Sequence, residues 1–591
     1  GAGPSGTVSV TATQSMQLHR GGQIYSSTLG PGDAGNVHVT APIVRLEGAE
    51  GSITSINSGS YGDASRRAGE VRLDVGQLDL RGPTAVSAET RSILGSAGSV
   101  VVRADRVTID GLGSYSASIN ALAVGDAGDA GRIDVQARES LVLRDGGALL
   151  AGSLGQGRVG SIAVATPLLR VDGTGALKTF TGIGGDAFFY DPQGQSSQRA
   201  GVGAEVVVDA AAVQLVNGGV ISSATNTTAD AGSVTLRADT LLIDGGGGTY
   251  GATGLSTDGA SSGRAGSIRI EARQIDVRAE GSISSSAVDT GPGGLIDVQA
   301  QRLTLDSAGG IYSVAASSGN AGSITLNVTE ALVLSRGGAI AANTGGEGAA
   351  GTVVIRAGAL TAEGRDPASG LTSRIVSRAL VDSGGRTGSV DIDVSGPMVV
   401  RDHAELGITN RATVADPTVL SATALRIRAG SLLVQDADIS AAATGNTAAG
   451  RVDVQVAGVA TLERAGILTS AIDGDGGSLA LHAGGTLRLR DARITTSVEG
   501  RSNGNGGGID LAAGALVMQS GFVQANTAAP LASGGQVQVS APVLLPDGSR
   551  VAIGGSQIES FRPGIAGGNV IQAAAPDGVA GTLAVTLPQV D

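Results

Sequence analysis

The chain has no cysteine and no tryptophan, a single lysine (Lys178), and only six tyrosines and five phenylalanines among 591 residues. Without cysteine there is no disulfide scaffold, no thiolate metal site and no cysteine nucleophile. No apolar run reaches the roughly 18 to 20 residues that a membrane-spanning helix requires. The 53 acidic residues outnumber the 40 basic ones, for a net charge of −13, which disfavours binding to phosphate backbones. We therefore expect no nucleic-acid partner and no integral membrane segment.

Glycine, by contrast, is abundant, with 97 residues, more than twice its usual share of about 7%. Collagen is excluded, because glycine does not recur at every third position and proline contributes only 16 residues. Disorder is disfavoured, because 41% of the residues are hydrophobic and only 16% are charged. The composition indicates a folded chain with many turns.

A repeated unit runs through the whole sequence, in which a small residue and a glycine are followed by alternating apolar residues. Examples of this marker glycine are Gly35, Gly131, Gly232 and Gly351. The spacing averages about 31 residues, a period typical of solenoids. The interval from Gly388 to Gly450 is about twice as long and predicts a hidden, degenerate copy.

Within each unit, three short stretches alternate between apolar and polar residues, which predicts strands with one buried face. We predict an all-β fold, a right-handed parallel β-helix (a solenoid) of about 19 coils with three short strands per coil. Glycines are expected to supply the positive φ angles of the corners. A single helix over 1–591 is expected, ending in a terminal coil and tail at 569–591.

Two intervals are too long for one coil and predict insertions, at 174–202 and at 362–387. The first contains four of the eleven aromatic residues close to the only lysine. These aromatics either fold back as a small satellite core or form a contact for a partner, because exposed aromatics concentrate binding energy. The candidate partner-binding loop consists of Lys178, Phe180, Phe188, Phe189 and Tyr190.

Catalytic and metal-binding patterns are few. Three pairs of aspartates are placed to share a face: Asp391 with Asp393, Asp436 with Asp438, and Asp473 with Asp475. The four histidines, at 19, 38, 403 and 482, lie in different repeats, without the spacing of a zinc site. We interpret these groups as solvated surface and predict no catalytic residue, no metal and no cofactor.

The repeats resemble those of the filamentous-haemagglutinin-like exoproteins of bacterial two-partner secretion. Residues 309–313 read Gly-Gly-Ile-Tyr-Ser, and residues 317–326 read Ser-Ser-Gly-Asn-Ala-Gly-Ser-Ile-Thr-Leu. Residues 575–583, Ala-Pro-Asp-Gly-Val-Ala-Gly-Thr-Leu, are similar to the stretch that closes the helix in many members. The resemblance is to the repeat region and carboxyl-terminal part of the family. The chain opens inside a repeat, so we expect a fragment or a processed product.

The resemblance implies export through an outer-membrane two-partner transporter to the outside or the surface of a Gram-negative cell. The expected function is that of an adhesin-type exoprotein, not an enzyme, whose repeats form a rigid shaft. Its partner would be a host-cell, matrix or carbohydrate receptor, or other copies of itself. The alternative is a subunit of an extracellular filament or surface layer. A polysaccharide lyase or hydrolase is the third hypothesis.

Overall fold

The computed structural model describes residues 4–62, 66–91, 95–124, 128–153, 157–176, 179–186, 202–246, 252–500, 502–546, 550–562 and 568–586. By its internal contacts the chain forms two units, residues 1–300 (unit 1) and residues 301–591 (unit 2). The strand β20 (Leu295–Asp306) contains the division. Each unit is described by itself.

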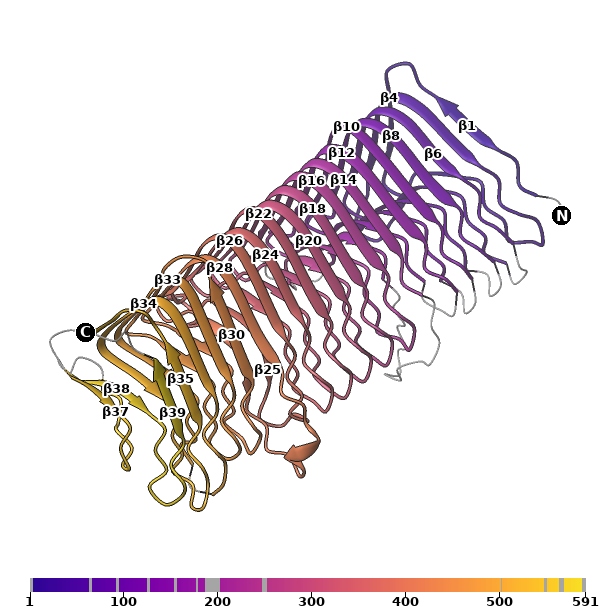
Figure 1. Ribbon diagram of the computed structural model, residues 1–591. Helices are drawn as coiled ribbons and strands as arrows, with labels where there is room; N and C mark the ends of the chain where they lie inside the picture. The colour runs from indigo at the N-terminus through magenta and orange to yellow at the C-terminus, as the bar shows by residue number, and fades with distance from the viewer. Residues whose placement is uncertain are drawn as a thin grey trace. The chain divides into compact units, whose positions relative to one another are not determined.

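Unit 1 is built from long strands that alternate with short ones, and Figure 1 shows its long strands running side by side. The layer of long strands begins with β1 (Val8–Thr11) and β2 (Ser15–His19), which pair with the two halves of the first long strand. The long strands are β4 (Val37–Glu47), β6 (Val71–Arg81), β8 (Ser99–Asp110), β10 (Arg132–Arg144), β12 (Ser161–Asp172), β14 (Glu205–Val216), β16 (Ser233–Asp244) and β18 (Ser267–Arg278). The short strands are β3 (Gln23–Tyr25), β5 (Thr54–Asn57), β7 (Thr84–Ser87), β9 (Ala117–Asn120), β11 (Gly147–Leu150), β13 (Thr181–Gly184), β15 (Gly219–Ser222), β17 (Gly254–Ser256) and β19 (Ser282–Ser284).

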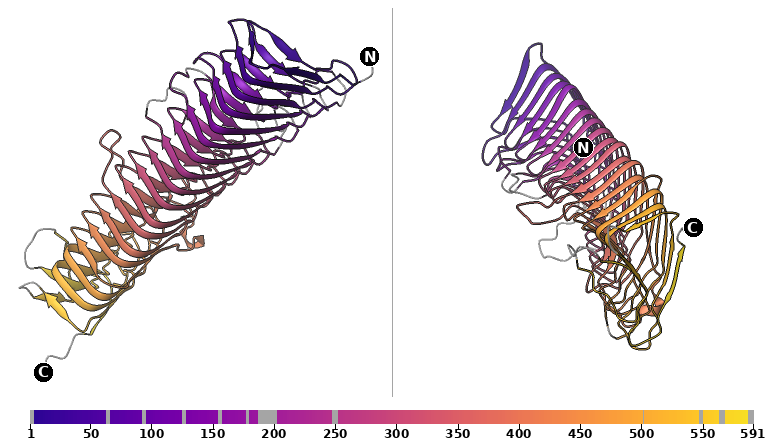
Figure 2. Two further views of the ribbon diagram at one scale, coloured as in Figure 1. Left: turned by 90° about the horizontal axis from the view of Figure 1, so that it is seen from above. Right: turned by 60° about the vertical axis from the view of Figure 1, so that its left-hand side comes forward.

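Unit 2 repeats the same alternation. Its long-strand layer comprises β22 (Ser323–Ser335), β24 (Val353–Glu363), β26 (Val390–Arg401), β28 (Ala424–Gln435), β30 (Arg451–Val456), β31 (Ala460–Glu463), β33 (Leu479–Thr495), β34 (Ile509–Gln524), β35 (Gln536–Ser540) and β36 (Leu544–Pro546). The remaining strands are β21 (Gly310–Tyr312), β23 (Ala339–Ala341), β25 (Arg374–Ala379), β27 (Glu405–Asn410), β29 (Asp438–Ser440), β32 (Gly466–Leu468), β37 (Val551–Ile553), β38 (Asn569–Gln572) and β39 (Thr582–Thr586), and a short 3-10 helix spans Pro417–Val419. The strands of each unit keep this arrangement in the further views of Figure 2.

Every strand pairs in parallel with its counterpart in the next coil, which confirms the predicted parallel β-helix. The described strands correspond to about 15–19 coils, a range that includes the predicted number. The three predicted stretches are present, but the first two usually merge into one strand of 11 to 13 residues. In β10 a register shift between Gln136 and Ser140 marks where they join.

Apolar side chains stack into columns because each strand alternates inward and outward residues. One column of unit 1 is paired coil by coil, with no member more than 1% exposed: Leu46, Leu80, Ile109, Leu143, Val171, Leu215, Ile243 and Val277. The short strands of unit 2 build a matching column of Ile311, Ile340, Ile375, Leu406, Ile439, Ile467 and Ile494. These columns form the core.

The marker glycines are required for close approach of the backbone, and the prediction that they supply positive φ angles is wrong for them. The N–H of Gly131 donates to the carbonyl of Ala121 at 2.9 Å, closing its coil. A Cβ on Gly131 would lie 1.7 Å from the carbonyl oxygen of Gly98, the marker glycine of the preceding coil. A positive φ occurs instead at corner glycines such as Gly146 (+98°).

The hidden copy between Gly388 and Gly450 is confirmed. Strand β28 pairs with β26 on one side and with β30 on the other. Its register places Thr423 where other coils have the marker glycine. The missing glycine explains why the copy is degenerate in sequence.

The two ranges predicted as insertions each contain a short strand of the coil. Within 174–202 lies β13, which pairs with β11 and β15, while residues 187–201 lie outside the described residues. Within 362–387 lies β25, preceded by a turn that an antiparallel bridge between Arg365 and Thr372 closes. The range 569–591 contains β38 and β39, which pair with β34 and β35.

Charged side chains line up at the ends of the long strands, where acid and base alternate between adjacent coils. In unit 1, Asp110 pairs with Arg144, and their closest atoms are 2.8 Å apart. In unit 2, Glu363 accepts a hydrogen bond from Arg401 Nε at 2.6 Å. Each such surface pair contributes about 0–1 kcal/mol, so their main effect is on register.

Candidate functional site

Most of the candidate partner-binding loop lies outside the described residues, namely Lys178, Phe188, Phe189 and Tyr190. The one described member, Phe180, is half-buried just before β13. Its ring lies over the glycines of that strand, since a Cβ on Gly182 or Gly184 would be 3.2 or 3.4 Å from ring atoms. Phe180 therefore contacts the coil itself.

The aspartate pairs noted in the sequence have different surroundings. Asp475 links two adjacent coils, because its Oδ1 accepts a hydrogen bond from the backbone N–H of Asn505 at 2.8 Å. Asp393 lies beside Arg428 of the next coil, so opposite charges are adjacent there. Asp436 and Asp438 line a common hollow.

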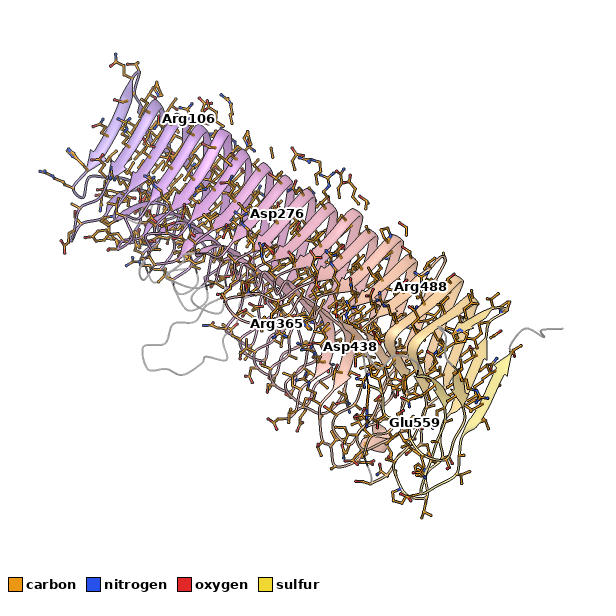
Figure 3. The ribbon with its side chains drawn as sticks, turned by 90° about the vertical axis from the view of Figure 1, so that its left-hand side faces the viewer. Arg106, Asp276, Arg365, Asp438, Arg488 and Glu559 are labelled. Carbon is orange, nitrogen blue, oxygen red and sulfur yellow. The ribbon has the colours of Figure 1, made fainter. Side chains whose placement is uncertain are left out.

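This hollow has a volume of about 750 Å³ and lies within unit 2, at strands β27 and β29. We call it the charged hollow and define it by its ionisable lining: His403, Glu405, Arg411, Asp436, Asp438 and Arg464. Hydroxyl groups from Thr372, Thr409, Ser440 and Thr444 complete its polar surface. Figure 3 shows Asp438 on the short-strand side, away from Arg488 on the long strand β33.

The strand pattern explains why charges gather here. In each short strand, the residue before the buried Ile or Leu points outward. Paired positions of this kind along unit 2 carry Gly310, Ala339, Arg374, Glu405, Asp438, Gly466 and Arg493. Glu405 and Asp438 are thus direct neighbours on adjacent coils, although 33 positions apart in sequence.

Two of the three carboxylates in the charged hollow are held by arginines. Glu405 forms an ion pair with Arg378, whose side chain is only 12% exposed. Asp436 accepts hydrogen bonds from Arg464 Nε and Nη2, both at 2.7 Å. These bonds hold the pKa of Asp436 below its usual value. Asp436 is therefore ionised at neutral pH.

Asp438 has a different environment. It forms no ion pair with any described residue, and loss of water to neighbouring atoms raises the pKa of its carboxyl, as does the charge of Glu405. Arg493 and the N–H of Gly466 oppose this increase. Part of the side chain stays accessible from the hollow. Gly466 makes room for it, because a Cβ there would be 2.7 Å from Asp438 Oδ1.

Two further groups of the charged hollow have no partner for their side chains among the described residues. Thr409 is only 7% exposed and lines the hollow, yet no hydrogen bond engages its hydroxyl. Arg411 is exposed, and no carboxylate of the described chain pairs with it. The arrangement can thus offer a guanidinium, an unengaged hydroxyl and a carboxyl to a ligand.

Unit 2 contains two other hollows. One, of about 580 Å³, follows the bend of the long strands past Asp393, Arg428 and His482, where His482 Nε2 is 3.1 Å from Asp510. The other, of about 600 Å³, is lined by Phe522, whose ring packs edge-on against Phe561 at 5.2 Å. The charged hollow differs from both because it brings three carboxylates together with arginine and hydroxyl side chains.

Sequence reasoning missed Glu405, Thr409 and Arg411. The signal that would have found Glu405 is an alignment of the repeats on the buried residues Leu406 and Ile439, which places Glu405 directly beside Asp438. The same alignment also places Thr409 and Arg411 near these residues. It does not show that their side chains lack a partner, because this depends on where the neighbouring side chains lie.

The described residues include no group of three or more His, Asp or Glu side chains placed to hold a metal ion. No helix among them has the length and apolar character needed to cross a membrane. No family model matches the sequence, and comparison with curated proteins and with solved structures found no significant match.

Proposed function

We propose that the chain is the shaft of a secreted or cell-surface adhesin-type exoprotein of a Gram-negative bacterium. The observation that carries the proposal is the uninterrupted register of buried columns within each unit, such as the one from Leu46 to Val277. In such a solenoid each coil contacts only its neighbours, so a long rigid body is built from a simple repeat. A rigid body of this kind suits the presentation of a binding surface.

The composition supports export as an unfolded chain through an outer-membrane transporter of the two-partner type. A chain without cysteine forms no disulfide loop before it crosses a pore. A single coil does not bury enough apolar surface to offset the entropy of ordering its residues. Folding is therefore expected to follow emergence, coil upon coil.

An attachment assay tests the adhesive function. Beads coated with the purified chain are presented to cultured cells, to extracellular matrix and to surfaces coated with polysaccharide. We expect saturable attachment to at least one surface, with competition by the soluble chain. Attachment no greater than that of beads coated with an inert protein would contradict the proposal.

A further inference from the structure

The polar groups of the charged hollow that the protein leaves unengaged indicate the chemistry of a ligand. Thr409 is more than nine-tenths buried as a residue, but its hydroxyl oxygen stays accessible at the hollow and has no hydrogen-bond partner among the described residues. Arg411 is a fixed positive charge without a carboxylate partner among the described residues. Asp438 presents a carboxyl that no described cation pairs directly. All three line the same hollow.

When the flanking Arg378 and Arg493 are included, four arginines meet the three carboxylates of the hollow. Glu405 is balanced by Arg378, and Asp436 by Arg464. Asp438 lies within the electrostatic influence of Arg493. Arg411 remains uncompensated, so the hollow favours a ligand that carries a negative group at this end.

The shape of the hollow suits an extended ligand. From Glu405 to Arg411 the chain runs along strand β27 and one residue beyond it, which spans roughly 20 Å at the usual rise per residue. The apolar part of the lining consists of Ala404, Ala437, Ala442 and Leu468. Such a floor offers little to an apolar ligand, whereas the hydroxyls and charged groups match a polymer rich in hydroxyl groups.

We propose that the charged hollow binds a carboxylated saccharide chain, with Arg411 pairing a sugar carboxylate and Thr409 and Asp438 hydrogen-bonding sugar hydroxyls. A guanidinium engages a carboxylate through two parallel hydrogen bonds, which gives the contact both strength and direction. This proposal names the receptor class for the adhesive function above and rests on it. The binding step itself is measurable on the purified chain alone.

Calorimetric titration with four oligosaccharides tests the proposal: hexagalacturonate, a hyaluronan hexasaccharide, and the methyl ester of each. The esters keep the length and the hydroxyls but lose the negative charge. We expect saturable binding of at least one acidic oligosaccharide and about tenfold weaker binding of its ester, the size expected for one charge-assisted hydrogen-bonded contact. Absence of binding to both acidic forms, or equal binding of acid and ester, would overturn the proposal.

Three variants locate the site. Arg411→Gln is expected to weaken binding of the acid about tenfold and to leave binding of the ester nearly unchanged. Thr409→Val is expected to weaken both ligands without lowering the melting temperature, because the lost hydroxyl has no partner in the folded chain. Arg488→Gln removes an exposed arginine from a long strand and serves as the matched control. Equal effects of Arg411→Gln and Arg488→Gln would place binding elsewhere.

The two proposals fail in different ways. If Arg411→Gln loses oligosaccharide binding while coated beads still attach, the hollow binds saccharide and adhesion uses another surface. If beads fail to attach to any surface while the purified chain binds the acidic oligosaccharide, the adhesive function is wrong and the saccharide site stands.

Discussion

Replacing the marker glycine Gly507 by alanine, with Gly508→Ala as its control, tests whether the stacking of glycines determines the stability of the coil. The two residues are adjacent and both lack a positive φ, so backbone conformation does not distinguish them. A Cβ on Gly507 would lie 1.8 Å from the carbonyl oxygen of Gly477, whereas a Cβ on Gly508 meets nothing within 4 Å. Sequence alone treats them as equivalent members of the run at 506–508.

The structure sets the size of the effect. The Cβ···O contact at position 507 has to lengthen from 1.8 Å to at least 3.0 Å, which separates two coils locally. This movement strains the hydrogen bond from Gly507 N–H to the carbonyl of Thr496, now 3.0 Å long, and the ladder beside it. Overpacking costs about 1–3 kcal/mol, and each hydrogen bond lost adds about 1 kcal/mol. With that one hydrogen bond lost, we expect Gly507→Ala to destabilise the fold by about 2–4 kcal/mol.

The control variant, Gly508→Ala, is expected to raise the stability of the fold slightly. Alanine at a compatible glycine position restricts the unfolded chain and stabilises by about 0.4–1 kcal/mol. Denaturant unfolding followed by circular dichroism compares the two variants, and hydrogen exchange of peptides from 476–510 reports local fraying. Identical unfolding midpoints and identical exchange in the two variants would refute the reasoning that coil contact, rather than turn geometry, requires the marker glycine.

Two further predictions concern ionisable side chains, one on stability and one on enzymatic activity. Burial raises the pKa of Asp186, which is 7% exposed, from 3.8 to about 6, so the folded chain holds this proton more tightly than the unfolded chain. Stability therefore falls as pH rises from about 4 to about 6, and Asp186→Asn should remove about 3 kcal/mol of this change in pH-dependent unfolding. The chain is also expected to release no reducing ends or unsaturated products from polygalacturonate. If such products are released, and if both Glu405→Gln and Asp438→Asn abolish the release, the chain is a carbohydrate-active enzyme instead.

The fold was predictable because its information is local and repeated. Alternation around residues such as Ile311 and Leu334 specifies strands with one buried face, and the period of the marker glycine specifies the coil. The role of that glycine was not predictable, because the neighbour of Gly131 that excludes a Cβ is Gly98, one coil away. In the sequence, the small residues around the marker glycine and its regular spacing fit a corner glycine just as well as a glycine that contacts the next coil.

The candidate site was harder to predict, since its members come from different coils. The pair Asp436 and Asp438 is visible in the sequence because the two residues are two positions apart. The partner that changes the surroundings of Asp438 is Glu405, and Arg378 lies one coil further back. Register brings these residues together, and register is a property of the folded stack. The hidden copy at Thr423 was predictable only as an unusually long interval.

The pairing of Glu405 with Asp438 is the feature of unit 2 that coil stability alone does not explain. Residues at paired positions of adjacent coils lie about 4.8 Å apart, and two like charges at this distance repel by about 1–3 kcal/mol at a protein surface. Elsewhere the adjacent position carries the opposite sign, as for Glu363 and Arg401, or no charge at all. Arg378 pairs directly with Glu405, whereas Asp438 has only the charge of Arg493 nearby. A ligand whose hydroxyls donate to both carboxylates relieves it directly, and this relief is a physical reason for ligand binding in the charged hollow.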